Sequence, residues 1–182
     1  MEEAKLRETM LETTEVYSGR LLHVRSDKIR LPDGGVSGRE YIRHNGAVAI
    51  IPVTDSGEVI IERQFRYPVD EVITEIPAGK LDTKDEPRLD AAKRELREET
   101  GITADEWTDL GTFYPTSAYS DEVITIYMAR GLHYGERKLD EGEFLNVEAV
   151  PLADLVNSVM AGEIPDGKTQ AAVLKAARIL GI

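Results

Sequence analysis

The sequence contains no cysteine among its 182 residues, which excludes disulfide bonds and thiolate chemistry. It also contains no apolar run as long as a transmembrane span, and its N-terminus, MEEAKLRETMLETTEV, has no apolar core of signal-peptide length. From these absences we expect a cytoplasmic protein that does not associate with a membrane.

Positive charge is also scarce. The chain has 22 Lys and Arg residues against 34 Asp and Glu, a formal net charge of −12. A surface that binds nucleic acid needs a basic face to neutralise phosphates, so this balance argues against a nucleic-acid partner. A small anionic substrate can still bind if metal ions and a few local arginines oppose the overall field.

The first 45 residues predict a small β subdomain. Residues 1–14 are charged and have no clear period, so we expect a frayed end or a short helix there. Residues 17–31 contain an alternating run, PDGG at 32–35 is a strong turn signal, and a second run extends to Ile42; together they predict an antiparallel hairpin. A two-stranded hairpin is marginal alone in water, so this one is expected to pack against something else.

Residues 46–182 predict a larger domain of strands and helices. The continuous apolar run GAVAIIPV at 46–53 is typical of a strand buried on both faces. Further strands are expected at 58–65, 72–76, 107–114, 122–129 and 144–150, a polar loop at 130–143, and helices at about 152–161 and 166–180. One helix among the strands and two after them predict a mixed sheet sandwiched between helices, an α/β/α arrangement.

The most informative stretch is GKLDTKDEPRLDAAKRELREETGI, residues 79–102. Its second half predicts a helix, because Pro87 suits a first turn, Gly101 suits a C-terminal stop, and apolar residues such as Leu96 share one side. The sequence therefore places a run of charged residues on a helix between two predicted strands.

Three carboxylates fall on one stripe of this helix. With Glu95 at zero on a helical wheel, Glu99 lies about 40° to one side and Glu98 about 60° to the other. Like charges at this spacing destabilise a helix by about 0.2–0.5 kcal/mol per pair, whereas a hard divalent cation such as Mg²⁺ would reverse the sign. The alternative is a solvated surface helix on which Arg94 and Glu98 simply pair.

These residues resemble the signature of the Nudix hydrolases, G-x5-E-x7-R-E-U-x-E-E-x-G-U, where U is aliphatic. From Arg94 to Ile102 every specified position matches. The front half departs by one residue: counting back from Arg94 gives Glu86 as the first acid, whereas counting forward from Gly79 gives Asp85. In the family this acid mostly orients the helix, and either residue can fill the position.

Flanking residues resemble the ADP-ribose pyrophosphatase branch of that family, through RQFRY at 63–67 and EIPAGK at 75–80. The resemblance implies that Arg66 reaches the diphosphate, a task that suits a planar bidentate donor. It also implies nucleoside contacts from the region of Arg39, and Pro115 matches a proline that accompanies ADP-ribose specificity. The alternatives are a surface charge for each arginine and an ordinary strand end for Pro115.

The resemblance further implies a metal site formed by the Ala78 carbonyl and the side chains of Glu95, Glu98 and Glu99, beside the signature's Arg94. Mg²⁺ is the expected ion and Mn²⁺ a substitute.

The resemblance to that branch also implies a general base from the loop before the last strand, where Glu141 is the first choice and Glu143 the alternative. Glu122 is a further candidate for substrate or metal contact. Loop acids are usually solvated, which is the competing interpretation for Glu141 and Glu143.

Taken together, the resemblance implies metal-dependent hydrolysis of a nucleoside diphosphate derivative, most simply ADP-ribose to AMP and ribose 5-phosphate. Another substrate, such as a nucleotide sugar, a dinucleotide or a nucleoside triphosphate, is the alternative within the enzyme class, and a nucleotide-sensing module is the alternative outside it. The branch also implies a homodimer that exchanges its N-terminal sheet. A hairpin folded onto its own domain is the competing interpretation.

Overall fold

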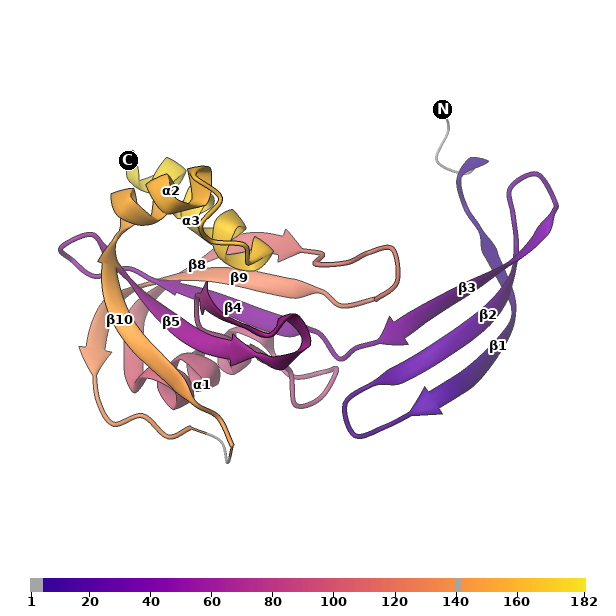
Figure 1. The fold of residues 1–182 in the computed structure, drawn as a ribbon, viewed down its shortest axis with the longest axis horizontal. Helices are drawn as coiled ribbons and strands as arrows, with labels where there is room; N and C mark the ends of the chain where they lie inside the picture. Colours follow the sequence, from indigo (N-terminus) through magenta and orange to yellow (C-terminus); the bar gives the residue numbers. More distant parts are fainter. Residues whose placement is uncertain (1–4, 140–141) are drawn as a thin grey trace. The chain divides into compact units, whose positions relative to one another are not determined.

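The computed structural model describes residues 5–139 and 142–182, shown in Figure 1. The chain forms two compact units. The N-terminal unit contains the residues up to Asn45 together with Thr116–Glu122, and the larger unit contains Gly46–Pro115 and Val123–Ile182. None of the helices in the described part of the chain has the length and apolar character needed to cross a lipid bilayer.

The N-terminal unit is built on a three-stranded antiparallel sheet in the order β1-β2-β3, with β1 at Thr9–Ser18, β2 at His23–Arg30 and β3 at Val36–Arg43. The expectation of a frayed end or a helix over residues 1–14 is wrong for residues 9–14, which belong to β1. The pairing of β1 with β2 shifts register between Met10 and Glu12 and again between Glu15 and Tyr17. Such irregularities interrupt the period of two, which is why the sequence did not reveal this strand.

The strands of the larger unit form two sheets. The first has the order β7-β4-β9-β8, with β7 at Ala78–Lys80, β4 at Ala47–Pro52, β9 at Ile124–Tyr134 and β8 at Ile102–Phe113. The second has the order β10-β5-β6, with β10 at Leu145–Pro151, β5 at Glu58–Arg66 and β6 at Glu71–Glu75. The parallel pairing of β4 with β9 beside antiparallel neighbours confirms a mixed sheet.

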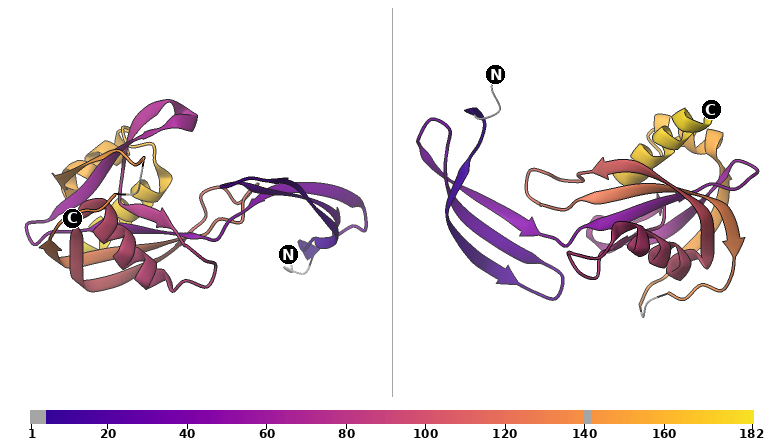
Figure 2. Two further views of the ribbon diagram at one scale, coloured as in Figure 1. Left: turned by 90° about the horizontal axis from the view of Figure 1, so that it is seen from below. Right: turned by 180° about the vertical axis from the view of Figure 1, so that it is seen from behind.

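Helices cover both sides of these sheets. Helix α1, Arg88–Thr100, lies on one side, and helices α2, Leu152–Met160, and α3, Gly167–Leu180, lie on the other, as Figure 1 and Figure 2 show. All of β4 is buried, and its successive side chains point to opposite faces. Val48 and Ile50 therefore pack in the core that includes residues of α1, whereas Ala49 and Ile51 pack in the core that includes residues of α2 and α3. The predicted α/β/α arrangement is confirmed.

Strand β9 is longer than the sequence predicts. It continues through residues 130–134, which we expected in a polar loop, because β8 begins at Ile102 and offers ladder partners as far as Tyr134. Strand β8 supplies the hydrogen bonds that keep this polar stretch of β9 extended.

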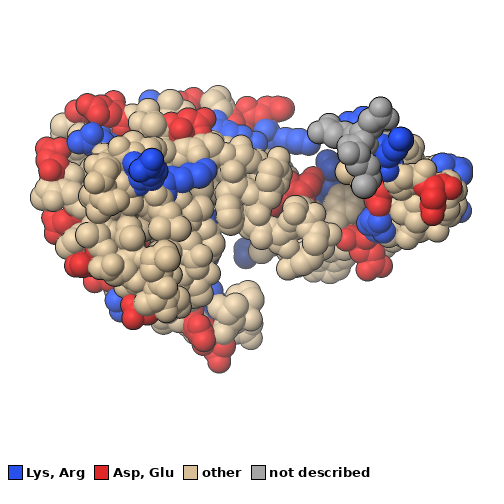
Figure 3. Space-filling model, turned by 90° about the horizontal axis from the view of Figure 1, so that it is seen from above, with Lys and Arg blue, Asp and Glu red and all other residues tan. Residues whose placement is uncertain are grey.

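On the face seen in Figure 3, basic side chains lie among acidic ones, so the charge of that face is mixed.

Candidate active site

Helix α1 carries the three signature glutamates, and its ends are well defined. Pro87 is the N-cap residue in an extended conformation, and the C-cap, Gly101, adopts φ 75° and donates its N–H to the Arg97 carbonyl at 2.9 Å. This left-handed conformation favours glycine. Glu99 is one of the buried residues of the helix, so the last turn carries an acid toward the protein interior.

Glu99 meets the backbone of β7. Its Oε2 accepts a hydrogen bond from the Ala78 N–H at 3.0 Å, and only 8% of the residue is exposed. Ala78, whose carbonyl is expected to bind a metal ion, therefore lies directly beside the Glu99 carboxylate, which is expected to bind the same ion.

Glu95 packs on the next residue of β7, Gly79. A Cβ built on Gly79 would overlap the carboxyl carbon and both oxygens of Glu95. Gly79 is not in the left-handed region. The glycine is thus required for space, because its bare backbone lets the Glu95 carboxylate approach the strand.

Arg94 connects the acids around it. Its Nη1 donates to Glu95 at 2.6 Å and to Glu98 at 3.3 Å, and its Nε and Nη2 donate to Glu86 at 3.3 Å. Glu86 in turn accepts the Asp82 N–H at 2.7 Å. Of the two candidates for the first acid of the signature, the structure brings Glu86 to Arg94, whereas Asp85 is exposed.

A second group of charged residues comes from β5 and β6. Arg66 forms a bidentate pair with Glu75, with Nε to Oε1 at 2.5 Å and Nη2 to Oε2 at 2.8 Å. The hydrogen bond and charge of Glu75 raise the pKa of Arg66. Burial by itself would raise the pKa of Glu75, but the hydrogen bonds and charges of Arg66 and Lys168 outweigh it and lower that pKa.

Glu62 lies directly opposite Glu75 in the β5–β6 ladder, and both residues are only 3% exposed. The Oε1 of Glu62 has no hydrogen-bond partner among the described residues. Burial and the charge of Glu75 raise the pKa of Glu62, and burial together with the charges of Glu62 and Glu95 raises that of Glu99. Burial and mutual repulsion therefore disfavour the ionised forms of Glu62 and Glu99.

These properties fit a divalent cation, because carboxylates crowded out of water need a positive charge to ionise together. The donor set is made of hard oxygens, the type that Mg²⁺ and Mn²⁺ prefer. Among the described residues, no group of three or more acidic or histidine side chains is arranged so that it could hold a metal ion by itself. Glu95 is instead hydrogen-bonded to Arg94, and Glu99 to the Ala78 N–H.

The loop after β9 is tied to the C-terminal end of α1. The Lys138 N–H donates to the Glu98 carbonyl at 2.9 Å, and the Gly135 N–H donates to the Gly101 carbonyl at 2.8 Å. The charge of Glu143, farther along this loop, adds to burial in raising the pKa values of Glu62, Glu95 and Glu99. Glu143 thus lies within electrostatic reach of the carboxylates, whereas Glu141 lies outside the described residues.

The two other candidates belong to the N-terminal unit. Arg39 pairs with Glu8 and donates to the Gly38 carbonyl at 2.8 Å. Glu122 lies 3.9 Å from the His44 ring nitrogen, and its N–H donates to Ser120 at 3.1 Å. They are therefore not among the residues that the larger unit gathers around α1.

Sequence reasoning missed Glu62, Glu75 and Lys168 as members of the site. Glu62 had a signal, since an acid within the apolar strand VIIE is unusual unless it is paired or functional. Glu75 and Lys168 are 93 residues apart, and no local pattern joins them.

Comparison with known proteins gives a consistent assignment. Residues 43–172 match the NUDIX domain, and residues 8–42 match the nucleoside diphosphate sugar hydrolase N-terminal domain. The chain is 40% identical to an ADP-ribose pyrophosphatase of Bacillus subtilis, over 92% of this chain and 91% of that protein. It is 38% identical to the methanol dehydrogenase activator of Bacillus methanolicus, over 91% and 90%. A crystal structure of an ADP compounds hydrolase aligns with a TM-score of 0.86 at 25% identity, covering 97% of this chain and 96% of that one.

Proposed function

Because this chain belongs to the Nudix hydrolase family, we propose that it hydrolyses ADP-ribose to AMP and ribose 5-phosphate in a metal-dependent reaction. The observation that supports the proposal most is that Arg66 lies within electrostatic reach of Glu99, the buried carboxylate of α1: the hydrogen bond with Glu75 does most to raise the pKa of Arg66, and the charge of Glu99 helps to raise it. The 40% identity to an enzyme named ADP-ribose pyrophosphatase supports the choice of substrate.

Arg66 is our candidate for the diphosphate contact. Glu75 occupies its Nε and Nη2, and 44% of the side chain is exposed. Within the part of the chain that the structure describes, the Nη1 group has no hydrogen-bond partner, so its N–H groups can bind another anion. Because Glu75 already fixes one edge of the guanidinium, the opposite edge can bind a phosphate with little further loss of side-chain entropy. The pair with Glu75 thus prepares Arg66 for the substrate.

The Ala78 carbonyl and the side chains of Glu95, Glu98 and Glu99 would hold the cation, which we propose to be Mg²⁺ with Mn²⁺ as a substitute. A cation bound there would neutralise diphosphate charge and would help to activate a water molecule. Arg94 keeps Glu95 and Glu98 from spreading apart, and Gly79 leaves room for Glu95 beside the strand. These contacts arrange the oxygens before the cation and the substrate arrive.

The loop before β10 supplies our proposed general base, a carboxylate that accepts a proton from the attacking water. Glu143 is supported by its electrostatic influence on Glu62, Glu95 and Glu99. Glu141, our first choice from the sequence, is the alternative, and separate mutation of the two residues distinguishes them.

The N-terminal unit supports a homodimer. Every residue of β1 is exposed, including Met10, Val16 and Tyr17, which are 56%, 56% and 57% exposed. A three-stranded sheet with this much apolar surface in water gains stability by covering it, and we propose a second copy of the chain as the cover. Arg39 and Glu122 would contribute substrate contacts from this unit. Light scattering during size-exclusion chromatography tests the proposal, and a monomer at micromolar concentration would contradict it.

Product analysis tests the substrate. Pure protein is incubated with ADP-ribose, ADP-glucose, NADH and ATP, each with and without Mg²⁺. We expect rapid Mg²⁺-dependent release of AMP from ADP-ribose. The match of residues 8–42 to a nucleoside diphosphate sugar hydrolase domain makes a nucleotide sugar the second candidate, and preference for ADP-glucose would favour it. The expected cytoplasmic location stays a prediction, which cell fractionation would test.

A further inference from the structure

Lys168, in the first turn of α3, reaches the charged pair formed by Arg66 and Glu75. Its ammonium contacts the Glu75 Oε2 and lies 3.1 Å from the Asp166 Oδ1, and its side chain is 11% exposed. Glu75 accepts from Lys168 and from both Arg66 donors, so one buried carboxylate joins the two cations. The expected substrate contact is thus linked to a helix that carries none of the signature residues.

The first turn of α3 is itself fixed in place. Asp166 is the N-cap, and its Oδ2 accepts from the Thr169 N–H at 2.9 Å and from the Thr169 hydroxyl at 2.6 Å. The Thr169 hydroxyl oxygen accepts the N–H of Ile76, the residue after Glu75, at 3.0 Å. The residues on either side of Lys168 are therefore fixed by hydrogen bonds: Asp166 and Thr169 bond to each other, and Thr169 also bonds to Ile76, beside Glu75.

Glu75 needs the charge that Lys168 brings. It is buried opposite Glu62 in the β5–β6 ladder, and two carboxylates at such positions repel each other. Arg66 comes from a strand end and is 44% exposed, so it satisfies Glu75 only from the solvent side. Without Lys168, Glu75 would lose a buried partner and its single conformation, and Arg66 would lose its fixed acceptor.

We propose that Lys168 is a positioning residue for the reaction: acting through Glu75, it fixes the guanidinium of Arg66 in the orientation that receives the diphosphate. The inference rests on the proposed role of Arg66 toward the substrate. It gives a function to the first turn of α3, although the signature residues lie on α1.

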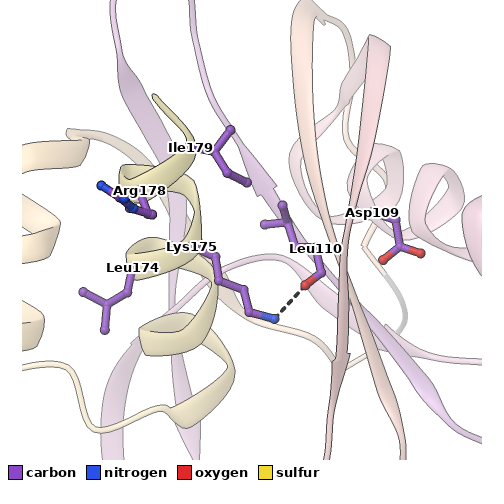
Figure 4. Close-up of a pocket in the computed structure, with 6 residues that line it drawn as sticks. All are labelled: Asp109, Leu110, Leu174, Lys175, Arg178 and Ile179. Carbon is purple, nitrogen blue, oxygen red and sulfur yellow. Dashed lines mark hydrogen bonds between the residues drawn. The ribbon is translucent and has the colours of Figure 1, made fainter. Parts of the chain in front are cut away.

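The first test observes Arg66 directly. In ¹H–¹⁵N spectra the Arg66 Nε–H signal is assigned from its loss in Arg66→Lys. We expect it to be shifted and slow to exchange in the wild-type protein, to become averaged and fast-exchanging in Lys168→Met, and to be restored in Lys168→Arg. Lys175→Met is the matched control, because Lys175 is also on α3 and donates to the Leu110 carbonyl at 2.6 Å, in a pocket of about 420 Å³ that contains none of the site residues (Figure 4).

An unchanged Arg66 signal in Lys168→Met would overturn the inference, whatever the substrate proves to be. If Lys168→Met does not fold, Lys168→Gln, which keeps an N–H donor without the charge, is measured in the same way. This test is independent of the proposed function, which the product analysis decides separately.

The second test is a kinetic cycle with the diphosphate substrate that the product analysis identifies. We expect Lys168→Met to raise KM about tenfold or more with a smaller change in kcat, because it removes an oriented binding contact. In an Arg66→Met background the same substitution should change KM less than about twofold, because the two residues act in series. Equal effects in the two backgrounds would overturn the inference, and so would an unchanged KM in Lys168→Met.

Discussion

Replacing Gly79 with alanine tests whether the contact between β7 and α1 builds the metal site. The new Cβ would lie 2.0–2.2 Å from all three carboxyl atoms of Glu95, so Glu95 must withdraw by about 1.4 Å before ordinary van der Waals contact at 3.4 Å is restored. Overpacking of this kind costs about 1–3 kcal/mol of folding stability. A displacement of about 1 Å in a positioned group can cost about a hundredfold in rate.

We therefore expect Gly79→Ala to lower kcat/KM about a hundredfold and to weaken Mn²⁺ binding, measured by electron paramagnetic resonance. The melting temperature should fall by about 2–4 °C for each kcal/mol lost. Gly38→Ala is the matched control, because Gly38 is also in a strand outside the left-handed region and its added Cβ would lie 3.7 Å from the nearest neighbour, the Asp27 carbonyl. That variant should keep the wild-type Mn²⁺ affinity, because its added Cβ overlaps none of the proposed metal ligands.

The effect of Gly79→Ala can also be measured in a Glu95→Ala protein. If the cost in stability arises from the Glu95 carboxylate, Gly79→Ala should cost much less in a Glu95→Ala protein, where the overlapping atoms are gone. Wild-type turnover in Gly79→Ala, or an equal loss of stability with and without the Glu95 side chain, would refute the reasoning.

Three further predictions concern the carboxylates. Glu99→Gln keeps an acceptor for the Ala78 N–H but removes the charge, so turnover should fall by orders of magnitude while the circular dichroism spectrum is retained; near-normal turnover would reject the metal role. Burial raises the pKa of Glu62 to about 8 and that of Glu99 to about 9, so the stability that these groups contribute is full below the ordinary value of 4.5 and is lost as pH rises toward 9. In EDTA the melting temperature should consequently fall between these pH values, and Mg²⁺ should raise it most at the alkaline end; a Mg²⁺ effect that does not depend on pH would contradict the linkage. Glu143→Gln should lower kcat about 10²–10⁴-fold with little change in metal affinity, whereas Glu141→Gln should be nearly silent, and the reverse result would move the base to Glu141.

Local chemistry was sufficient to predict much of this protein from its sequence. The helix at 88–100, the buried strand at 47–52 and the two final helices follow from periodicity, caps and apolar runs, which act between residues a few positions apart. The spacing of Glu95, Glu98 and Glu99 follows from the helical repeat alone. For the same reason the family could be recognised from residues 79–102.

Tertiary structure decided what depends on distant partners. The extended conformation of residues 9–14 and 130–134 comes from pairing with neighbouring strands, in one case across two register shifts that hide the alternation. Only the fold shows that Gly79 makes room for Glu95 and that Arg94 holds Glu86.

The same limit applies to the charged cluster of Glu62, Glu75 and Lys168, whose members come from β5, β6 and α3. The sequence by itself determined which carboxylates share a helix, because a helix fixes neighbours three and four residues apart. The tertiary structure decided which of them are buried and which cations they meet, because burial and long-range ion pairs depend on where the other strands and helices pack.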